Sequence, residues 1–349
     1  MSIKVRVLRA NHGDCILIIH EGTEGSFNLL IDGGSAATFK HGASAKHKGA
    51  LCVALDELKA KGQCIDLAIL THIDNDHIGG FLKAFKAQGY LSEMVKSIWF
   101  NSSKLITDYF NAPDIPENDV RIDFDSANTS AQQGKTLEVE LEKTSCQRAP
   151  LVIAGQTIKA GPFTFKILSP NEAGLKKLLH IWPLEKTPAE TSVANDYQIS
   201  FDKILEGDSF EPDTSIPNGS SIAFILSVND ISMLFLGDAH DAVVVSELHS
   251  LGYCSENKLP VKFVKVSHHG SRYNTSREFL NLVESDCYII STNGAIHGLP
   301  DKKTIARILV ETDASVLFNY EKIIKELSLP HEEELYFKRL LALSGELKF

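Results

Sequence analysis

The sequence lacks paired cysteines. Its six cysteines are scattered along 349 residues and form no C-x-x-C pair. They are Cys15, Cys52, Cys64, Cys146, Cys254 and Cys287. This spacing argues against a disulfide framework and against a thiolate zinc site, because both need clustered cysteines. We expect small, buried apolar thiols in a reducing compartment.

The sequence also lacks an apolar run long enough to cross a bilayer, and its first twenty residues alternate in polarity instead of forming a signal peptide. We therefore expect a cytoplasmic protein with no membrane partner. A basic excess is missing as well, since 35 basic against 45 acidic residues give a formal net charge of −10. That balance argues against sequence-independent wrapping of nucleic acid. It leaves phosphate substrates open, because bound cations change the local field.

What is present is a pattern of short apolar runs alternating with amphipathic segments, which is typical of an α/β protein. Strands are expected at 3–8, 15–20, 27–31, 65–71, 95–101, 163–169, 221–228, 231–236, 261–267 and 287–292. Helices are expected at 43–62, 78–90, 276–283 and 302–310. The two halves look alike in plan, with strands that end in loops rich in His and Asp.

Two polar stretches interrupt this pattern, at about 104–161 and 185–217, and predict insertions or long loops. The main domain is assigned to residues 1–325. Residues 326–349 carry apolar side chains at helical spacing around Pro330 and predict a helical tail packed on or near that domain, with partner docking as the alternative.

The loop "THIDNDHIGG" at 71–80 places two histidines and two aspartates within six residues. They are His72, Asp74, Asp76 and His77. Carboxylates this close raise one another's pKa unless a positive group lies between them, so the loop predicts a metal site. The alternative is a polar turn that caps the next helix, for which one such residue would suffice.

Further His and Asp residues follow two later strands. Asp238 comes after "LFLG", and His268 and His269 come after "FVKVS". Functional residues gather at strand ends because a rigid sheet can aim them from loops. Nitrogen and oxygen donors without thiolates suit Zn²⁺, Mn²⁺ or Fe²⁺. We favour Zn²⁺, with Mn²⁺ as an alternative.

The loop at 71–80 resembles the H-x-[HD]-x-D-H signature of the metallo-β-lactamase superfamily. The pieces "GDCILI", "LLIDGG", "ILSPN", "NGSSIAFIL", "LFLGD", "VKVSHHGS" and "TNGAIHGLP" also occur in this order in the branch that contains the hydrolase-like domain of bacterial competence (DNA-uptake channel) proteins and its stand-alone relatives. The Asp at the second ligand position is similar to that of bacterial phosphorylcholine esterases. The resemblance implies an αββα sandwich with polar insertions and a centre of two divalent metals.

Carried over to this sequence, the resemblance implies a ligand set for each metal. His72 and Asp74 would hold one ion, and Asp76, His77 and His269 the other, with Asp238 bridging both. Which of His268 and His269 is the ligand stays open. Asp32 would orient a ligand histidine. The sequence departs from most members at a further ligand histidine, because His180 lies in an expected helix and "IPNGSS" with Asn218 stands at the expected place.

Two neighbouring metals could share a hydroxide and clamp an in-line displacement at phosphorus. Asp76 and His268 are the predicted catalytic residues, with His268 protonating the leaving oxygen. Asn218, Ser271, Asn293 and His297 are predicted to contact substrate, with local loop bonding as the alternative. The predicted function is a phosphodiesterase or nuclease acting on nucleic acid or a small nucleotide or head group.

Two other functions remain open. An acyl hydrolase acting on a lactone, thioester or β-lactam is compatible with the superfamily, because fold alone cannot choose the chemistry. A partner-gated, weakly or non-catalytic component of a multi-protein bacterial system is compatible with the acidic composition. The polar stretches would then be docking surfaces or lids.

Overall fold

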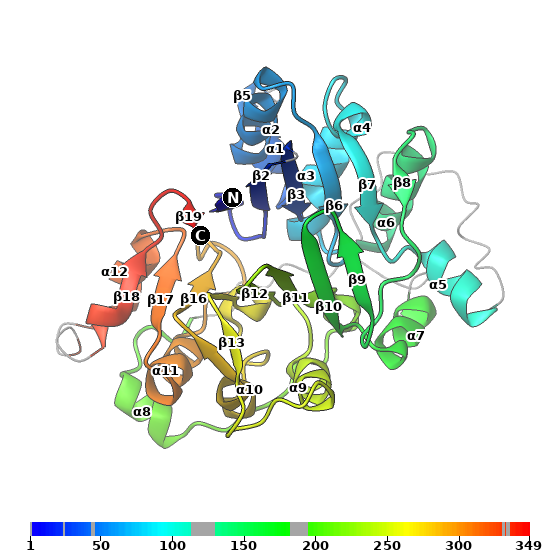
Figure 1. Ribbon diagram of the computed structural model, residues 1–349. Helices are drawn as coiled ribbons and strands as arrows, with labels where there is room; N and C mark the ends of the chain where they lie inside the picture. Colours follow the sequence, from blue (N-terminus) through cyan, green and yellow to red (C-terminus); the bar gives the residue numbers. More distant parts are fainter. Residues whose placement is uncertain are drawn as a thin grey trace. The chain divides into compact units, whose positions relative to one another are not determined.

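The computed structural model describes residues 2–23, 25–42, 46–112, 130–181, 195–329, 332 and 336–349. The chain divides into two compact units, each an α/β structure with its own sheet (Figure 1). Unit 1 contains Met1–Val152, Asn171–Ala189 and Leu347–Phe349. Unit 2 contains Ile153–Pro170 and Glu190–Glu346. The α/β class expected from the sequence is confirmed.

Unit 1 is built on a seven-stranded sheet in the order β19-β1-β2-β3-β6-β7-β8. Its strands are β1 (Ser2–Val7), β2 (Ile16–Gly22), β3 (Gly25–Ile31), β6 (Ile65–Ile69), β7 (Val95–Trp99), β8 (Gln147–Arg148) and β19 (Leu347–Lys348). β1, β2 and β3 form an antiparallel meander, whereas β3, β6, β7 and β8 run parallel. In β1 the apolar residues at every second position are buried, as the pleat of a strand requires.

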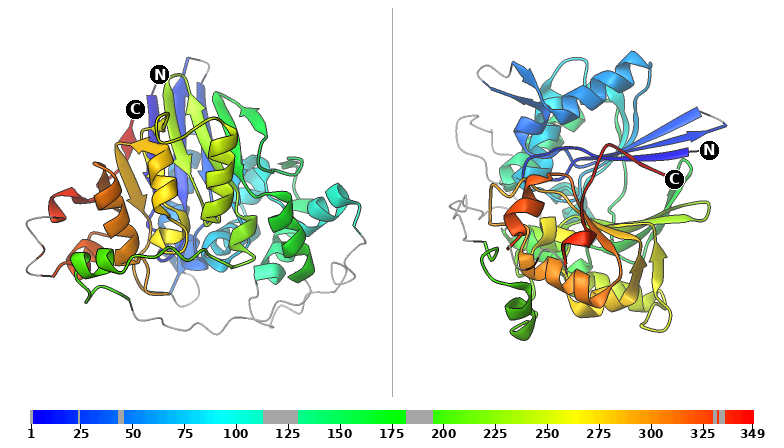
Figure 2. Two further views of the ribbon diagram at one scale, coloured as in Figure 1. Left: turned by 90° about the horizontal axis from the view of Figure 1, so that it is seen from below. Right: turned by 90° about the vertical axis from the view of Figure 1, so that its left-hand side faces the viewer.

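The helices of unit 1 are α1 (Ala36–Phe39), α2 (Ala50–Ala60), α3 (Asn75–Lys86), α4 (Leu91–Met94), α5 (Ser103–Phe110), α6 (Ser130–Glu142) and α7 (Glu172–Ile181). Two short strands, β4 (Lys40–His41) and β5 (His47–Lys48), pair with each other. The expected helix at 43–62 therefore begins only at Ala50, since His47 and Lys48 are committed to this pairing. Figure 2 shows α2 and α3 on one face of the unit 1 sheet.

Unit 2 is built on an eight-stranded sheet in the order β18-β17-β16-β14-β12-β11-β10-β9. Its strands are β9 (Thr157–Ala160), β10 (Phe163–Ser169), β11 (Ala223–Val228), β12 (Ile231–Phe235), β14 (Val264–Lys265), β16 (Cys287–Ile290), β17 (Ser315–Phe318) and β18 (Leu340–Ala342). β13 (Leu259–Val261) and β15 (Val283–Ser285) form a separate parallel pair. The strands from β12 to β18 are parallel neighbours, so the loops that leave their carboxyl ends meet at one edge.

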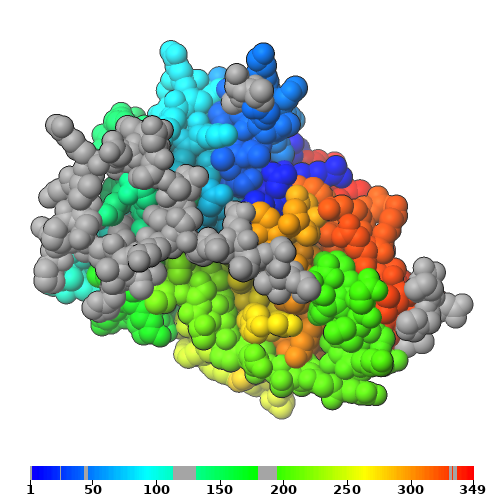
Figure 3. All heavy atoms as spheres, turned by 180° about the vertical axis from the view of Figure 1, so that it is seen from behind, coloured from blue at the N-terminus to red at the C-terminus, as the bar shows by residue number. Residues whose placement is uncertain are grey.

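The helices of unit 2 are α8 (Phe201–Glu206), α9 (Asp241–Ser250), α10 (Arg277–Leu282), α11 (Lys302–Glu311) and α12 (Lys322–Leu327), with 3-10 turns at η3 (Asn218–Ser220), η4 (Ser267–Gly270) and η5 (Phe337–Arg339). α9, α10 and α11 lie on one face of the unit 2 sheet (Figure 2). The green segment that contains α8 lies beside orange residues of the α11 region in Figure 3. Backbone N–H groups at the start of α11 hold this segment through the carboxylate of Asp196.

The C-terminal tail differs from the helical expectation. Residues 340–342 form β18, which extends the unit 2 sheet beside β17, and residues 347–348 form β19 beside β1. A sheet edge offers unpaired backbone N–H and C=O groups, and pairing with them outweighed a weak helical pattern. Pro330 lies outside the described residues.

The polar stretches at 104–161 and 185–217 contain regular structure where the structure describes them, namely α5, α6, β8, β9 and α8. Residues 113–129 and 182–194 lie outside the described residues. Whether the two stretches are insertions, and whether 1–325 is one domain, stay predictions. Among the described helices, none combines the length and apolarity that a membrane crossing needs.

Candidate metal centre

The unit 1 half of the predicted site lies where two parallel strands end. β3 and β6 are adjacent, and Asp32 follows the first while His72 follows the second. Glycine makes this junction possible: a Cβ on Gly80 would lie 1.9 Å from the carbonyl oxygen of Gly33. The two backbones are joined by hydrogen bonds from Gly33 N to His77 O and from Gly80 N to Gly34 O, each 2.8 Å. The backbones of the "DGG" and "IGG" pieces thus lie in close contact, and this contact fixes the position of the loop between β6 and α3.

A buried hydrogen-bond chain sets the orientation of both histidines in this loop. Asp32 accepts hydrogen bonds from Thr71 N (2.8 Å), Thr71 Oγ1 (2.8 Å) and His77 Nδ1 (2.8 Å). The Thr71 hydroxyl has one proton and donates it to Asp32, so His72 Nδ1, 3.1 Å away, donates to Thr71 Oγ1. Both imidazoles therefore carry their proton on Nδ1 and the lone pair on Nε2. Nε2 is the atom that a metal would bind.

The two aspartates of the loop lie next to these Nε2 atoms. Asp74 Oδ2 is 3.6 Å from His72 Nε2, and Asp76 Oδ2 is 3.8 Å from His77 Nε2. Asp74 occupies the N-cap position of α3, yet its side chain makes no capping hydrogen bond. The capping alternative therefore does not account for this carboxylate. Each spacing exceeds a direct hydrogen bond and suits two ligands that share a cation.

The turn at residues 10–14 supports Asp76 from behind. Asp14 N donates to Asp76 O (3.3 Å), and a Cβ on Gly13 would lie 1.8 Å from the same oxygen. Only glycine allows this approach of two backbones. The "NHGD" turn thus has a structural role beside the loop at 71–80.

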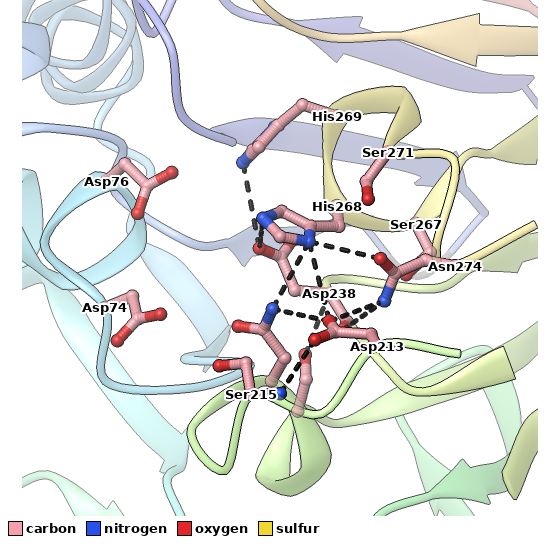
Figure 4. A network of polar contacts seen from close by, with 12 residues as sticks. Asp74, Asp76, Asp213, Ser215, Asp238, Ser267, His268, His269, Ser271 and Asn274 are labelled. Carbon is pink, nitrogen blue, oxygen red and sulfur yellow. Dashed lines mark hydrogen bonds and ion pairs between the residues drawn. The ribbon is translucent and has the colours of Figure 1, made fainter. Parts of the chain in front are cut away.

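The unit 2 half of the site lies at the ends of β12 and β14. Asp238 is buried, and its backbone N–H is fixed by Ser221 Oγ (3.0 Å). His269 Nδ1 lies 2.9 Å from the carbonyl oxygen of Ser291 and must donate to it, because a carbonyl only accepts. His269 Nε2 then faces Asp238 Oδ2 at 3.8 Å (Figure 4). This histidine has the same arrangement as the two in unit 1.

His268 differs from its neighbour. Its ring is partly exposed, and its Nδ1 lies among side chains rather than on a carbonyl: Asn274 Oδ1 (3.2 Å), Asn218 Nδ2 (3.2 Å) and Asp213 Oδ2 (3.6 Å). Its Nε2 is 3.9 Å from Asp238 Oδ2. Burial alone would lower the pKa of His268, but the negative charges of Asp238 and Asp213 raise it overall.

The donor atoms of each half suit a divalent metal. Three histidines turn Nδ1 toward a protein acceptor, which is the arrangement found for metal-binding imidazoles. In each half a carboxylate oxygen lies within 4 Å of the Nε2 atoms. Imidazole and carboxylate together suit Zn²⁺, Mn²⁺ or Fe²⁺. The residues that would hold metal are His72, Asp74, Asp76, His77, Asp238 and His269.

The predicted substrate residues divide into two groups. Asn218 and Ser271 are both buried in unit 2. Ser271 Oγ accepts a hydrogen bond from Tyr273 N (3.3 Å). Asn293 Oδ1 accepts from Ala295 N (3.0 Å), which is a bond within its own loop. His297 is exposed, with φ +60°. Among the described residues, no polar contact joins either of the last two to His268 or Asp238.

Sequence reasoning missed three residues of this region, Thr71, Asp213 and Asn274. Thr71 directly precedes His72 in the loop after β6, and this position beside a predicted ligand was the sequence signal for its role. Asp213 lies in the polar stretch at 185–217, and Asn274 lies six residues beyond His268. The backbone of His180 lies in α7, as the helical expectation for "KKLLHIWP" predicts.

Comparison with known proteins gives a match to one family model over part of the chain. Residues 8–144 match the model of the metallo-beta-lactamase superfamily. A search of curated proteins found no significant match. Among solved structures, the metallo-beta-lactamase fold protein YhfI from Bacillus subtilis is similar at 10% identity and a TM-score of 0.43, with 99% of both chains covered.

Two further structures show the same level of similarity. The diiron β-hydroxylase CmlA from Streptomyces venezuelae has 12% identity and a TM-score of 0.43, and the match covers 100% of this chain and 54% of CmlA. Zn²⁺-bound PqqB from Methylobacterium extorquens has 8% identity and a TM-score of 0.40, with 100% of this chain and 99% of PqqB covered.

Proposed function

We propose that the chain is a metal-dependent phosphodiester hydrolase of the metallo-β-lactamase superfamily, whose model matches residues 8–144. The superfamily consists in general of metal-dependent hydrolases. The observation that carries the metal-dependent part is the common arrangement of His72, His77 and His269. Each has Nδ1 committed as a donor and Nε2 beside a carboxylate.

The proposed metal ligands follow from the motifs and from the chemistry of each half. His72, Asp74, Asp76, His77, Asp238 and His269 are the residues that would hold the divalent ions. His269 is assigned as the ligand because its Nδ1 is fixed on the Ser291 carbonyl, whereas His268 is held by side chains. Zn²⁺ is the preferred ion, with Mn²⁺ as the alternative. When bound, a divalent ion supplies hydroxide at neutral pH by lowering the pKa of water.

The protein groups have separate tasks in this reaction. Asp76 holds the attacking water through its partly exposed carboxylate. As the bond from phosphorus to the leaving oxygen breaks, the electron pair stays on that oxygen, and His268, as the doubly protonated imidazolium, donates a proton to it from Nε2. Asn218 and Ser271 are proposed to orient the phosphate, and Asn293 and His297 to reach the remainder of the substrate.

A small phosphodiester, such as a nucleotide or head group, is favoured over long nucleic acid. Three aspartates in the ligand set make hard oxygen sites, which suit ions that also bind phosphate oxygens. The formal charge of −10 would disfavour a long polyanion in the absence of a basic face. A protein partner that gates the activity in a multi-component system remains the alternative.

Parallel assays on three substrates test the proposal. Purified protein with Zn²⁺ or Mn²⁺ is given bis-p-nitrophenyl phosphate, nitrocefin or a thioester. Hydrolysis of the phosphodiester alone, abolished by a chelator, is the expected result. Hydrolysis of only the acyl substrates would replace the proposal with an acyl hydrolase. Two bound metals with no hydrolysis of any substrate would favour the partner-gated function.

A further inference from the structure

Asp213 lies beside His268 in unit 2, and both oxygens of its carboxylate are engaged. One oxygen, Oδ1, accepts from Ser215 N (2.8 Å), which closes a local turn. The other, Oδ2, accepts from Asn218 Nδ2 (2.8 Å) and Asn274 Nδ2 (2.9 Å) and lies 3.6 Å from His268 Nδ1. Asp213 N also donates to the carbonyl of Tyr273 (3.0 Å). The carboxylate is thus fixed on both oxygens beside one imidazole (Figure 4).

The bonds of Asn274 determine which nitrogen of His268 carries a proton. Asn274 Nδ2 faces three acceptors: Asp213 Oδ2 (2.9 Å), Ala239 O (3.3 Å) and Asp238 O (3.4 Å). Its amide oxygen is therefore the atom 3.2 Å from His268 Nδ1. An amide oxygen only accepts, so Nδ1 must donate.

Asn218 completes the surroundings of the same nitrogen. Its Nδ2 lies 3.2 Å from His268 Nδ1, but its short hydrogen bond is the 2.8 Å one to the Asp213 carboxylate. A charged acceptor is the stronger partner for an amide N–H. The amide oxygen and the nearby carboxylate then both favour a proton on Nδ1. Nε2 of His268 is left facing Asp238 Oδ2 at 3.9 Å.

The backbone gives independent support. His268 (φ 46°, ψ 50°) and His269 (φ 53°, ψ 20°) are consecutive left-handed residues. A non-glycine residue there is strained and persists only where the surroundings over-determine its conformation. His268 N donates to Gly237 O (2.9 Å). The side chains of Asn274, Asn218 and Asp213 surround Nδ1 of its ring. Strain of this kind gathers at functional sites, where a side chain must be presented in one direction.

We propose that Asp213 is a positioning residue that fixes His268 with its proton on Nδ1 and its Nε2 toward Asp238. Because Nδ1 keeps its proton, any proton that His268 transfers is gained and given up at Nε2, which carries it only in the imidazolium form. This consequence rests on the proposed function, in which His268 protonates the leaving oxygen. The orientation itself does not depend on that function. Asp213 acts through His268 and touches no reacting atom.

The tautomer can be measured without metal or substrate. A long-range ¹H–¹⁵N correlation spectrum of the metal-free protein distinguishes Nδ1–H from Nε2–H imidazoles, and His268 is assigned by its loss in His268→Asn. The wild type is expected to show the Nδ1–H form at His268. In Asp213→Asn, which keeps the shape but turns an acceptor into an amide, that form should be lost at His268 and kept at His269.

Glu211→Gln is the matched control, since it removes an exposed carboxylate from the same segment. It should leave the His268 signal unchanged. An Nε2–H signal at His268 in the wild type would overturn the proposal even if the Asp213 variant failed to fold. An unchanged Nδ1–H signal in a folded Asp213→Asn would overturn it as well.

Kinetics then connect the tautomer to the reaction. Asp213→Asn should keep its metal content and lose about 10²-fold in kcat with an alkyl leaving group, because general-acid help is worth roughly that much. The loss should be much smaller with p-nitrophenolate, which leaves without a proton. Equal losses with both leaving groups would contradict the positioning role. If the wild type hydrolyses no phosphodiester, the proposed function fails while the spectrum still decides the role of Asp213.

Discussion

Nδ1 of His77 lies 2.8 Å from Oδ2 of Asp32, and both side chains are buried. The same carboxylate accepts two hydrogen bonds from Thr71. Asp32, which follows β3, therefore holds the loop that follows β6. Asp32 itself has a left-handed backbone (φ 56°). This geometry suits a residue that orients a metal ligand without binding the metal.

Replacing Asp32 with Ala should therefore weaken metal binding 10- to 100-fold, which is the usual cost of losing such a partner. Chelator competition on folded protein measures this affinity. Asp66→Asn is a matched control: Asp66 also accepts a backbone N–H at a neighbouring strand, from Asn28, but contacts neither histidine. Equal metal affinity in Asp32→Ala and the wild type would contradict the orienting role.

Gly13→Ala tests the support behind Asp76. The new Cβ would lie 1.8 Å from the Asp76 carbonyl oxygen, so one of the two backbones must move. We expect a large loss of metal content together with a lowered melting temperature. Gly207→Ala is the control, because its Cβ would meet nothing nearer than 3.8 Å. A Gly13→Ala protein with full metal content would show that the turn does not position Asp76.

The buried ion pair between Lys302 and Glu332 predicts a stability effect separate from the site. Lys302 Nζ lies 2.7 Å from Glu332 Oε2, and both side chains are almost fully buried. Lys302→Met leaves Glu332 charged and buried, which should cost about 3–5 kcal/mol in urea unfolding. Adding Glu332→Gln removes that charge and should recover part of the loss.

The exposed pair of Lys322 and Glu326 is the control for this experiment, since such pairs contribute about 0–1 kcal/mol. Lys322→Met should change the unfolding free energy only slightly. A Lys302→Met effect as small as that one would mean that the buried pair does not hold α11 to its neighbours.

Asp208 predicts how stability changes with acidity. Burial alone would raise the pKa of Asp208, but hydrogen bonds and charge from Arg307, with Lys303 and Arg277, hold it at about 2. The unfolded chain takes up the proton near its ordinary value of 3.8, so the contribution is present above pH 4 and is lost as pH falls toward 2. About 1 kcal/mol should be lost between pH 5 and pH 3.

Urea unfolding of the wild type and Asp208→Asn at these two pH values measures the effect. The difference between the two proteins should shrink by that amount at pH 3, because the variant has no carboxyl to protonate. A difference that stays constant with pH would show that Asp208 is not held in its ionised form by the three cations.

The strands that position the site were predictable because each is a short apolar run that ends in polar residues. α9 was not, since "DAVVVSELHS" carries a run of valines that does not read as a helix. β18 and β19 exist through pairing with remote strands, and local patterns carry no such information. The helical spacing of apolar residues in the tail therefore predicts a helix where the structure has β18 and β19.

The clusters of His and Asp could be predicted because they follow strands within the same short segment. Asp213 could not, because its role comes from contacts with residues distant in sequence. Asp213 also lies in a stretch whose Asp, Pro and Ser content is typical of loops. Its function is visible only when the loop after β14 is folded against it.

Elemental analysis of the purified wild type and Asp238→Ala tests the central claim most directly. The wild type should contain about two transition-metal ions per chain, as expected for a two-metal hydrolase, and the variant should lose most of them. Asp230→Ala, at the exposed turn between β11 and β12, should keep the wild-type content. A metal-free wild type, or an Asp238→Ala protein with undiminished metal, would contradict the account.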